Sequence, residues 1–376
     1  MRLTTLPALC VSLLTPSCHR RVVQPQGCCG IDEAAATSLL LRWYPEHAVP
    51  TERVFQVTEE PTDPRISYIA ARVYPELGTK SQAELALKNG DLLHNGQCCT
   101  GSARVGPGDE LTLTVRPLPR PPQQKLSSTA RFVVHLLEQG LSVPYEDDHV
   151  AVVFKPPGIH TKRKSNPKFA ALEDALPAVV CPSHDLLQDA LPLPLAMHRL
   201  DVPVCGVVLV AKSRRAAIGI AKQLEERRVQ KTYHALLVGR PDADGLLEAP
   251  VDDLPSTSRL RVLDETPHAQ WGSLCRVELN PLTGRTHQLR IHTAGIGCPI
   301  VGDELYWEMA AKAREESGAP PLPALKVKGG LFLQSCAVRF AHPVSGDELA
   351  VEVPEVAKFE KLLERARRGA EYAREG

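Results

Sequence analysis

A short, wholly apolar run, VVLVA at residues 207–211, constrains the fold of this chain more than any other feature. The run is rich in β-branched residues and is short, so it predicts a strand that is buried on both faces. His198, Arg199 and Asp201 come just before it, in what we expect to be a loop. Burying ionised groups is costly unless they are paired or well hydrogen-bonded. Rigid scaffolds commonly present reactive groups from such loops, so these three residues form a candidate functional site.

A second concentration of polar residues lies in the segment NPLTGRTHQLRIHTAGIG, which begins at Asn280. The pattern predicts a strand that ends at Asn280, a glycine turn, and a short helix capped by Thr286. His287 and Arg290 are three residues apart and would share one face of that helix. A guanidinium on a rigid helix is a good bidentate partner for a carboxylate. Arg290 is therefore a candidate partner for an acidic residue elsewhere in the chain.

Composition excludes several classes of protein. The 376 residues can hold one large domain with a small one, and 44 basic against 44 acidic side chains argue against a uniformly basic nucleic-acid-binding surface. The 11 cysteines include no CxxC pair, and His198, His287 and His292 form no recognisable ligand set, so we expect neither disulfides nor a metal site. Because no run of about 18 apolar residues occurs, we expect no membrane span.

Residues 1–31 have the composition of a targeting segment. They contain Arg2, Arg20 and Arg21 but no acidic residue, and Asp32 is the first acid of the chain. This composition favours a transit peptide for a chloroplast or a mitochondrion. A secretory signal and a disordered tail are the alternatives, and without organellar targeting we expect a cytoplasmic protein.

Residues 64–116 are expected to form a small α+β domain. The pattern predicts two short helices, a hairpin at Asn95-Gly96, and an alternating strand after a Pro-Gly turn. This order of elements resembles the RNA-binding module first known from a small-subunit ribosomal protein, the S-four-type module. Glu84 and Asp91 stand at positions that are often basic in that module. A small α+β domain without a ligand is the alternative.

The proline-rich residues 117–130 predict a semi-rigid linker to a large domain at 131–376. In that domain, HRLDVPVCGVVLVAK, ERRVQKTYHALLVG, NPLTGRTHQLRIH and GCPIVGDELYW occur in the order and spacing of the RluA-type pseudouridine synthases, and the resemblance covers roughly residues 144–353. It implies a pseudouridine synthase fold, which is an α+β domain with a mixed, largely antiparallel sheet and flanking helices. It also implies an isomerase that converts specific uridines of structured ribosomal or transfer RNA to pseudouridine without a cofactor or metal. We expect a monomer.

The resemblance also assigns roles to residues. Asp201 is implied to be the nucleophile, attacking either carbon 6 of the uracil or the anomeric carbon of the sugar. Tyr233 is implied to pack on the target base, and Arg290 to pair with the aspartate. An arginine favours the ionised carboxylate, and an aromatic ring offsets part of the cost of flipping out a base. The residues expected to contact RNA are His198, Arg199, Lys155, Lys162, Arg163, Lys164, Arg285 and His287.

The chain departs from the family pattern after HRLD, where Val204-Cys205-Gly206 replaces the usual Thr-Ser-Gly. Two other functions therefore remain open. One is a non-catalytic RNA-binding or ribosome-assembly protein built on a silenced synthase fold. The other is a thiol hydrolase that uses Cys205 with His198.

Overall fold

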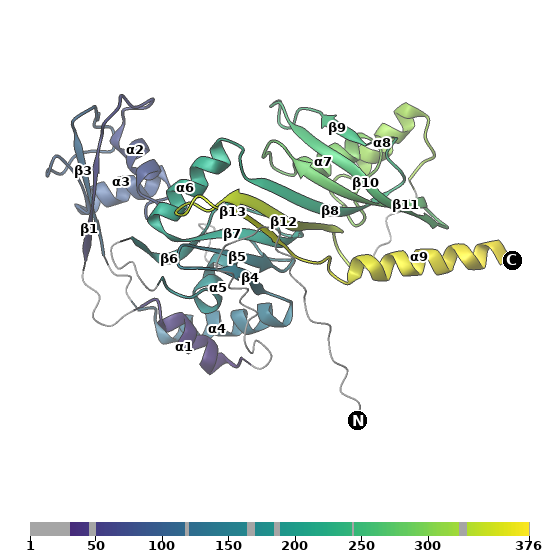
Figure 1. Ribbon diagram of the computed structural model, residues 1–376, viewed down its shortest axis with the longest axis horizontal. Coiled ribbons are helices and arrows are strands. Elements are labelled where there is room, and N and C mark those ends of the chain that lie inside the picture. Colours follow the sequence, from purple (N-terminus) through teal and green to yellow (C-terminus); the bar gives the residue numbers. More distant parts are fainter. Residues whose placement is uncertain are drawn as a thin grey trace.

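The computed structural model describes residues 31–44, 50–116, 120–163, 170–183, 189–242, 244–322 and 329–375. Nearly all of the expected targeting segment, and Lys164, lie outside these ranges. The described chain forms a small module with its own three-stranded sheet and a large domain built on a ten-stranded sheet (Figure 1).

The ten-stranded sheet forms the body of the large domain. Its main path is, in spatial order, β4 (Ser142–Glu146), β5 (Val150–Lys155), β7 (Cys205–Ser213), β12 (Leu333–Ala341), β8 (Gln230–Val238), β11 (Gly272–Pro281), β10 (Thr257–His268) and β9 (Gly245–Glu248). Two more strands attach to it: β6 (Ala190–Ala196) pairs with β7, and β13 (Glu348–Glu352) pairs with β12. Among the described strands, only β7 and β12 run parallel. The predicted α+β fold with a mixed, largely antiparallel sheet is confirmed.

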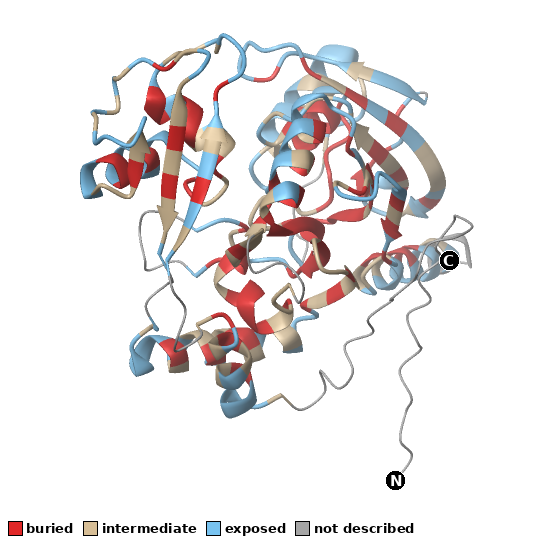
Figure 2. Cartoon of the chain, turned by 60° about the vertical axis from the view of Figure 1, so that its left-hand side comes forward, coloured by how far each residue is buried: buried red, intermediate tan, exposed pale blue. Residues whose placement is uncertain are grey.

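Strand β7 is the buried strand that the sequence predicts. All nine of its residues are buried, and successive side chains feed two different hydrophobic cores. Val208 and Val210 join one core, whereas Val207 and Leu209 join the other. This is the alternation that a strand covered on both faces must show. Figure 2 shows buried residues on both helices and strands in the interior of the molecule, with exposed residues toward the outside.

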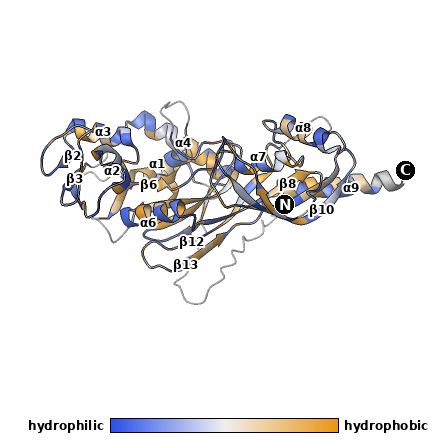
Figure 3. Ribbon diagram, turned by 90° about the horizontal axis from the view of Figure 1, so that it is seen from above, coloured by the Kyte–Doolittle hydropathy of each residue, from blue (hydrophilic) through white to orange (hydrophobic). Residues whose placement is uncertain are grey.

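Helices cover both faces of the sheet. They are α1 (Glu33–Leu41), α4 (Gln123–Glu138), α5 (Leu172–Val179), α6 (Arg214–Glu225), α7 (Gln288–Gly295), α8 (Trp307–Ser317) and α9 (Lys358–Glu375). Helix α9 packs against the large domain, because its Phe359, Leu363 and Ala366 are buried in the larger core. The surface helices carry both hydrophilic and hydrophobic residues (Figure 3). In the described part of the chain, no helix is long and apolar enough to cross a membrane.

The predicted linker at 117–130 is partly wrong. Helix α4 already begins at Gln123, and its Leu126 and Ala130 are buried in the larger core. The large domain therefore begins before residue 131. It also includes α1, which packs on α4 and α5 although it precedes the module in the chain. The module is thus inserted into the large domain.

The module itself has the predicted order of elements, with one strand more. Its helices α2 (Ile66–Val73) and α3 (Lys80–Asn89) pack on a sheet of order β1 (Thr51–Gln56), β3 (Glu110–Val115) and β2 (Leu92–His94). The expected start at residue 64 is therefore too late, because β1 pairs with β3 along its whole length. The predicted hairpin at Asn95-Gly96 is present, closed by His94 and Gln97, whose amides each donate to the other's carbonyl at 2.9 Å.

The module rests on α6 of the large domain. Arg72 of α2 pairs with Glu225 of α6 at 3.1 Å. Arg214, at the start of α6, donates to the carbonyl of Val73 at 3.2 Å and lies over the Tyr74 ring, 5.1 Å from its centroid. Helix α6 therefore lies between the module and the remainder of the large domain (Figure 1).

Candidate active site

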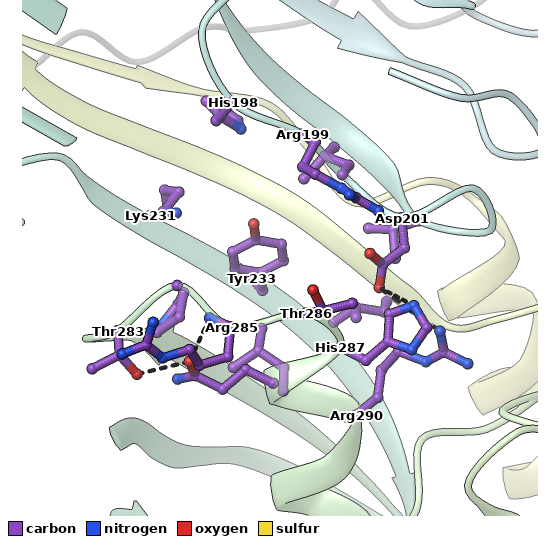
Figure 4. Close-up of a pocket in the computed structure, with 17 residues that line it drawn as sticks. His198, Arg199, Asp201, Lys231, Tyr233, Thr283, Arg285, Thr286, His287 and Arg290 are labelled. Atoms are coloured by element: carbon purple, nitrogen blue, oxygen red, sulfur yellow. Dashed lines mark hydrogen bonds and ion pairs between the residues drawn. The ribbon is translucent and has the colours of Figure 1, made fainter. Parts of the chain in front are cut away.

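A cavity of about 260 Å³ opens where three separate segments of the large domain meet. The loop before β7, strand β8 and the segment from the end of β11 into α7 all line it. Its labelled polar residues are His198, Arg199, Asp201, Lys231, Tyr233, Thr283, Arg285, Thr286, His287 and Arg290 (Figure 4). The two polar concentrations of the sequence are therefore brought together around one space.

Asp201 presents a partly exposed carboxylate to this cavity. Its side chain is 18% exposed, and its Oδ2 lies 3.6 Å from Nε2 of His287 and 3.7 Å from Nη1 of Arg290. The loop that carries it is closed by a turn in which the Val204 amide donates to the Asp201 carbonyl at 3.1 Å. The carboxylate therefore faces the cavity with an imidazole and a guanidinium beside it, an arrangement suited to a carboxylate nucleophile.

Arg290 has a closer partner than the one we expected. Its Nε and Nη2 donate to the two carboxylate oxygens of Asp303 at 2.8 and 2.7 Å, a bidentate pair that is almost fully buried. Burial opposes the charge of Arg290, but Asp303 and Asp201 outweigh it and raise the pKa of the guanidinium. Arg290 is therefore held by Asp303 and turned toward Asp201. Asp303 was not among the expected site residues, although it lies in the motif GCPIVGDELYW.

A tight turn places Asp303. The preceding Gly302 has φ of 80°, and a Cβ atom there would lie 2.0 Å from the carbonyl oxygen of Gly330. Only glycine fits this close approach of two backbones. The turn brings Asp303 under α7, within reach of Arg290.

His287 is fixed in an unusual backbone conformation. It precedes α7 at the capping position with φ of 56°, in the left-handed region that non-glycine residues rarely adopt. The predicted cap at Thr286 is therefore wrong. Nδ1 of His287 is hydrogen-bonded to the Tyr306 hydroxyl at 2.9 Å, and the Arg290 guanidinium lies over the Tyr306 ring. Tyr306, which was not among the expected site residues either, therefore contacts both His287 and Arg290, the two groups that face Asp201.

Tyr233 lies in the middle of the cavity, on β8, with Asp201, His287 and Arg290 grouped on one side of it (Figure 4). Its ring is nearly buried, and burial together with the negative charge of Asp201 raises the pKa of the hydroxyl. Lys231, two residues earlier and overlooked in the sequence, also lines the cavity, and burial lowers its pKa. A base placed here would meet an aromatic face inside a wall that combines apolar side chains with charged and polar ones.

His198 is neutral and already engaged. Its Nε2 accepts a hydrogen bond from the Leu209 amide at 3.1 Å, and burial, assisted by the positive charge of Lys231, lowers its pKa to about 3. Cys205 is buried, and burial raises the pKa of its thiol. A thiolate–imidazole pair is absent here, so the geometry contradicts a thiol hydrolase that uses these two residues.

The expected RNA contacts lie in different surroundings. Arg199 and Lys162 are exposed, and Arg285 lines the cavity. Arg163 is exposed too, but its guanidinium is bonded to the Asp174 carboxylate and the Glu173 carbonyl.

Lys155 is the one expected RNA contact that the structure excludes. It is fully buried, and its Nζ donates to the carbonyls of Pro156, Ile159 and Val202 at 3.0, 3.1 and 3.4 Å. Burial lowers its pKa to about 8. Lys155 therefore joins the loop after β5 to the Asp201 loop instead of meeting a phosphate.

Within the described residues, no group of three His, Cys, Asp or Glu side chains is arranged to hold a metal ion.

Comparisons of the sequence with known proteins agree on one family. Residues 149–295, which include Asp201, Tyr233 and Arg290, match the family described as RNA pseudouridylate synthase. Ribosomal large subunit pseudouridine synthase C of Vibrio cholerae is 33% identical over 266 residues, covering 66% of this chain and 74% of that protein. Ribosomal large subunit pseudouridine synthase D of Xanthomonas campestris pv. campestris is 29% identical over 336 residues, covering 82% and 92%. The solved structure of Human RNA Pseudouridylate Synthase Domain Containing 1 is 25% identical, covers 57% of this chain and 84% of its own, and has a TM-score of 0.43.

Proposed function

The chain belongs to the RNA pseudouridylate synthase family and is an RNA pseudouridine synthase, an isomerase, and on this premise we propose that Asp201 is its nucleophile and large-subunit ribosomal RNA its substrate. The observation that carries the first part is the position of the Asp201 carboxylate, which faces a cavity with Tyr233 inside it and Arg290 at 3.7 Å. The second part rests on the relatives, which are named as large-subunit enzymes.

The proposed reaction needs only the groups of the cavity. An Asp201 oxygen attacks either carbon 6 of the uracil or carbon 1′ of the sugar, and the bond between N1 and C1′ breaks. The base then turns, C5 bonds to C1′, and the carboxylate is released. The proton on C5 is lost and N1 gains one, so product and substrate have the same atoms. Arg290 places a positive charge 3.7 Å from the Asp201 carboxylate, and Tyr233 offers a stacking face worth about 1–3 kcal/mol to the flipped base.

The experiment uses transcripts whose uridines carry tritium at carbon 5, because the isomerisation releases that label to water. Large-subunit ribosomal RNA and transfer RNA are each incubated with the wild type and with Asp201→Asn, which keeps the shape of the side chain but not its charge. Release from ribosomal RNA by the wild type alone supports both parts of the proposal. Release by Asp201→Asn at the wild-type rate contradicts the assignment of the nucleophile, and release from transfer RNA alone contradicts the substrate.

We further propose that the protein acts as a monomer in an organelle. The acid-free composition of residues 1–31 supports the location. Residues 1–31 fused to a fluorescent protein should direct it to chloroplasts or mitochondria, whereas diffuse fluorescence would contradict the proposal. Sedimentation of the purified chain should give the mass of one copy.

A further inference from the structure

A second depression, of about 440 Å³, adjoins the active-site cavity. The two share Lys231, Pro281, Thr283 and Gly284 in their linings, so they form one continuous surface. We call the second depression the side groove. It runs from Lys231 to Arg227, which follows the C-terminal end of α6, and to Arg259 at the start of β10.

The side groove is positively charged although the chain as a whole is neutral. Lys231, Arg227 and Arg259 line it, and no carboxylate does among the described residues. Both arginines are exposed, and neither has an ion-pair partner in the described part of the chain. Three positive charges without a counter-ion favour an anionic ligand.

The neighbouring arginines show that this lack of partners is particular to the groove. Arg228, next to Arg227, pairs with Glu226, and Arg261, two residues after Arg259, pairs with Glu278 at 2.9 Å. Acidic side chains are thus available at the end of α6 and on β11, the strand next to β10, but they are engaged outside the groove. The groove arginines remain free for a ligand.

The floor of the groove is rigid. The Asn280 side-chain amide donates to the Lys231 carbonyl and the Thr232 hydroxyl, and the Thr283 hydroxyl donates to Gln288 at 2.7 Å. Gln288 in turn donates to the Ser258 hydroxyl at 2.8 Å. Such a network orders the surface before a ligand arrives, so less entropy is lost on binding.

The lining also indicates which part of a nucleic acid would lie there. No aromatic side chain lines the side groove among the described residues, so it offers no stacking platform for bases. Guanidinium and ammonium groups instead match phosphate oxygens. The groove begins at the active-site cavity and ends beside α6, on which the module rests through Arg72 and Glu225 (Figure 1).

We propose that the side groove holds the phosphodiester backbone of the RNA strand that flanks the target uridine, and leads it from the cavity toward the module. This proposal rests on the proposed function. It assigns Arg227 and Arg259 to binding alone, because both lie outside the active-site cavity.

Two double variants test the proposal. The first carries Arg227→Gln and Arg259→Gln, and the matched control carries Arg228→Gln and Arg261→Gln. Both remove two positive charges from the same two parts of the chain, but only the first removes them from the groove. Circular dichroism and thermal unfolding test whether each variant folds like the wild type. If the first double variant does not fold, the single variant Arg259→Gln is compared with Arg261→Gln instead.

The measurement is the affinity for a large-subunit ribosomal RNA transcript as a function of salt. Each phosphate contact with a single strand contributes about 0.7 to the slope of log affinity against log salt, so the groove variant should lose about 1.4 from that slope. Its affinity should fall about tenfold or more relative to the control, and its tritium release at saturating RNA should stay near that of the wild type. A slope equal to that of the control would overturn the proposal and point to a different anionic partner, such as an acidic protein.

The two readouts separate this proposal from the proposed function. If the wild type binds RNA and the groove variant loses the slope, but no tritium is released from any transcript, the proposed function fails and the groove assignment stands. If tritium release is normal and the slopes of both variants agree, the groove assignment fails and the proposed function stands.

Discussion

Replacing Asp303 with asparagine tests the arrangement that directs Arg290 toward Asp201. Asp303 and Arg290 form a bidentate pair at 2.7 and 2.8 Å, with side chains 1% and 7% exposed. Breaking a buried pair by removing one charge costs about 3–5 kcal/mol, because the other charge stays buried without its partner. Asparagine can still accept one hydrogen bond, so we expect a loss near the lower end, about 3 kcal/mol.

Activity should fall as well. In the variant, Asp201 is the remaining carboxylate near Arg290, at 3.7 Å, and the guanidinium should shift toward it. A shift of about 1 Å in an active site can reduce a rate by about 10²-fold. We therefore expect tritium release by Asp303→Asn at saturating RNA to drop by about that factor, although Asp201 itself is unchanged.

Urea unfolding followed by circular dichroism measures the stability, and Glu278→Gln is the control. Glu278 pairs with Arg261 at 2.9 Å on the surface, where an ion pair contributes about 0–1 kcal/mol. If Asp303→Asn were within about 1 kcal/mol of the wild type and turned over within threefold of it, the buried pair would not be what holds Arg290.

Three further outcomes follow from other parts of the structure. Gly206 has φ of 128°, and a Cβ atom there would lie 2.2 Å from the Ser335 carbonyl oxygen, so Gly206→Ala should lower the free energy of urea unfolding by more than about 3 kcal/mol. A Cβ atom at Gly272 would meet nothing within 4 Å, so the control Gly272→Ala should lower it by about 1 kcal/mol. Burial opposes the charge of Asp147, but hydrogen bonds, chiefly from His342, outweigh it and lower the pKa of the carboxyl to about 2. Asp147→Asn should therefore lower the free energy of unfolding by about 2 kcal/mol at pH 7. This difference from the wild type should vanish as the pH falls from about 4 to 2. Cys205→Ser should release tritium at the wild-type rate, because the thiol is buried and its pKa is raised; inactivity in a folded variant would contradict this.

Local patterns were sufficient to predict those parts of the fold that neighbouring residues determine. The apolar run at 207–211 predicted β7, and Ser213 does cap the helix that follows it. Helix α4 was missed at its start because its buried stripe of Leu126, Ala130, Val133 and Leu136 crosses the boundary we placed at residue 131. Proline residues before Gln123 concealed the pattern further. Strand β1 was missed because its pairing partner, β3, lies more than 50 residues away.

In the candidate site too, local motifs predicted some residues, whereas contacts between distant segments determined others. Asp201, Tyr233 and Arg290 came from motifs, but the pair between Arg290 and Asp303 depends on a glycine turn folding against Gly330. The burial of Lys155 could not be foreseen, because the three carbonyls that receive its Nζ converge only in the folded chain. The sequence KPPG at residues 155–158 is the same whether its lysine faces a phosphate or the protein core.

The insertion of the module between α1 and α4 affects the order in which the chain can fold. The entropic cost of closing a loop rises by about 0.6 kcal/mol for each doubling of its length, and about 80 residues separate these two helices. Thr51 and Val115, at the two ends of the module, are paired across β1 and β3. When the module has already folded, only about 16 residues remain in the loop to be closed, because the paired ends of β1 and β3 hold the module's two ends together, and this lowers the cost by about 1.4 kcal/mol. Early folding of the module thus places α1 near α4 and makes it easier for these two helices to pack together.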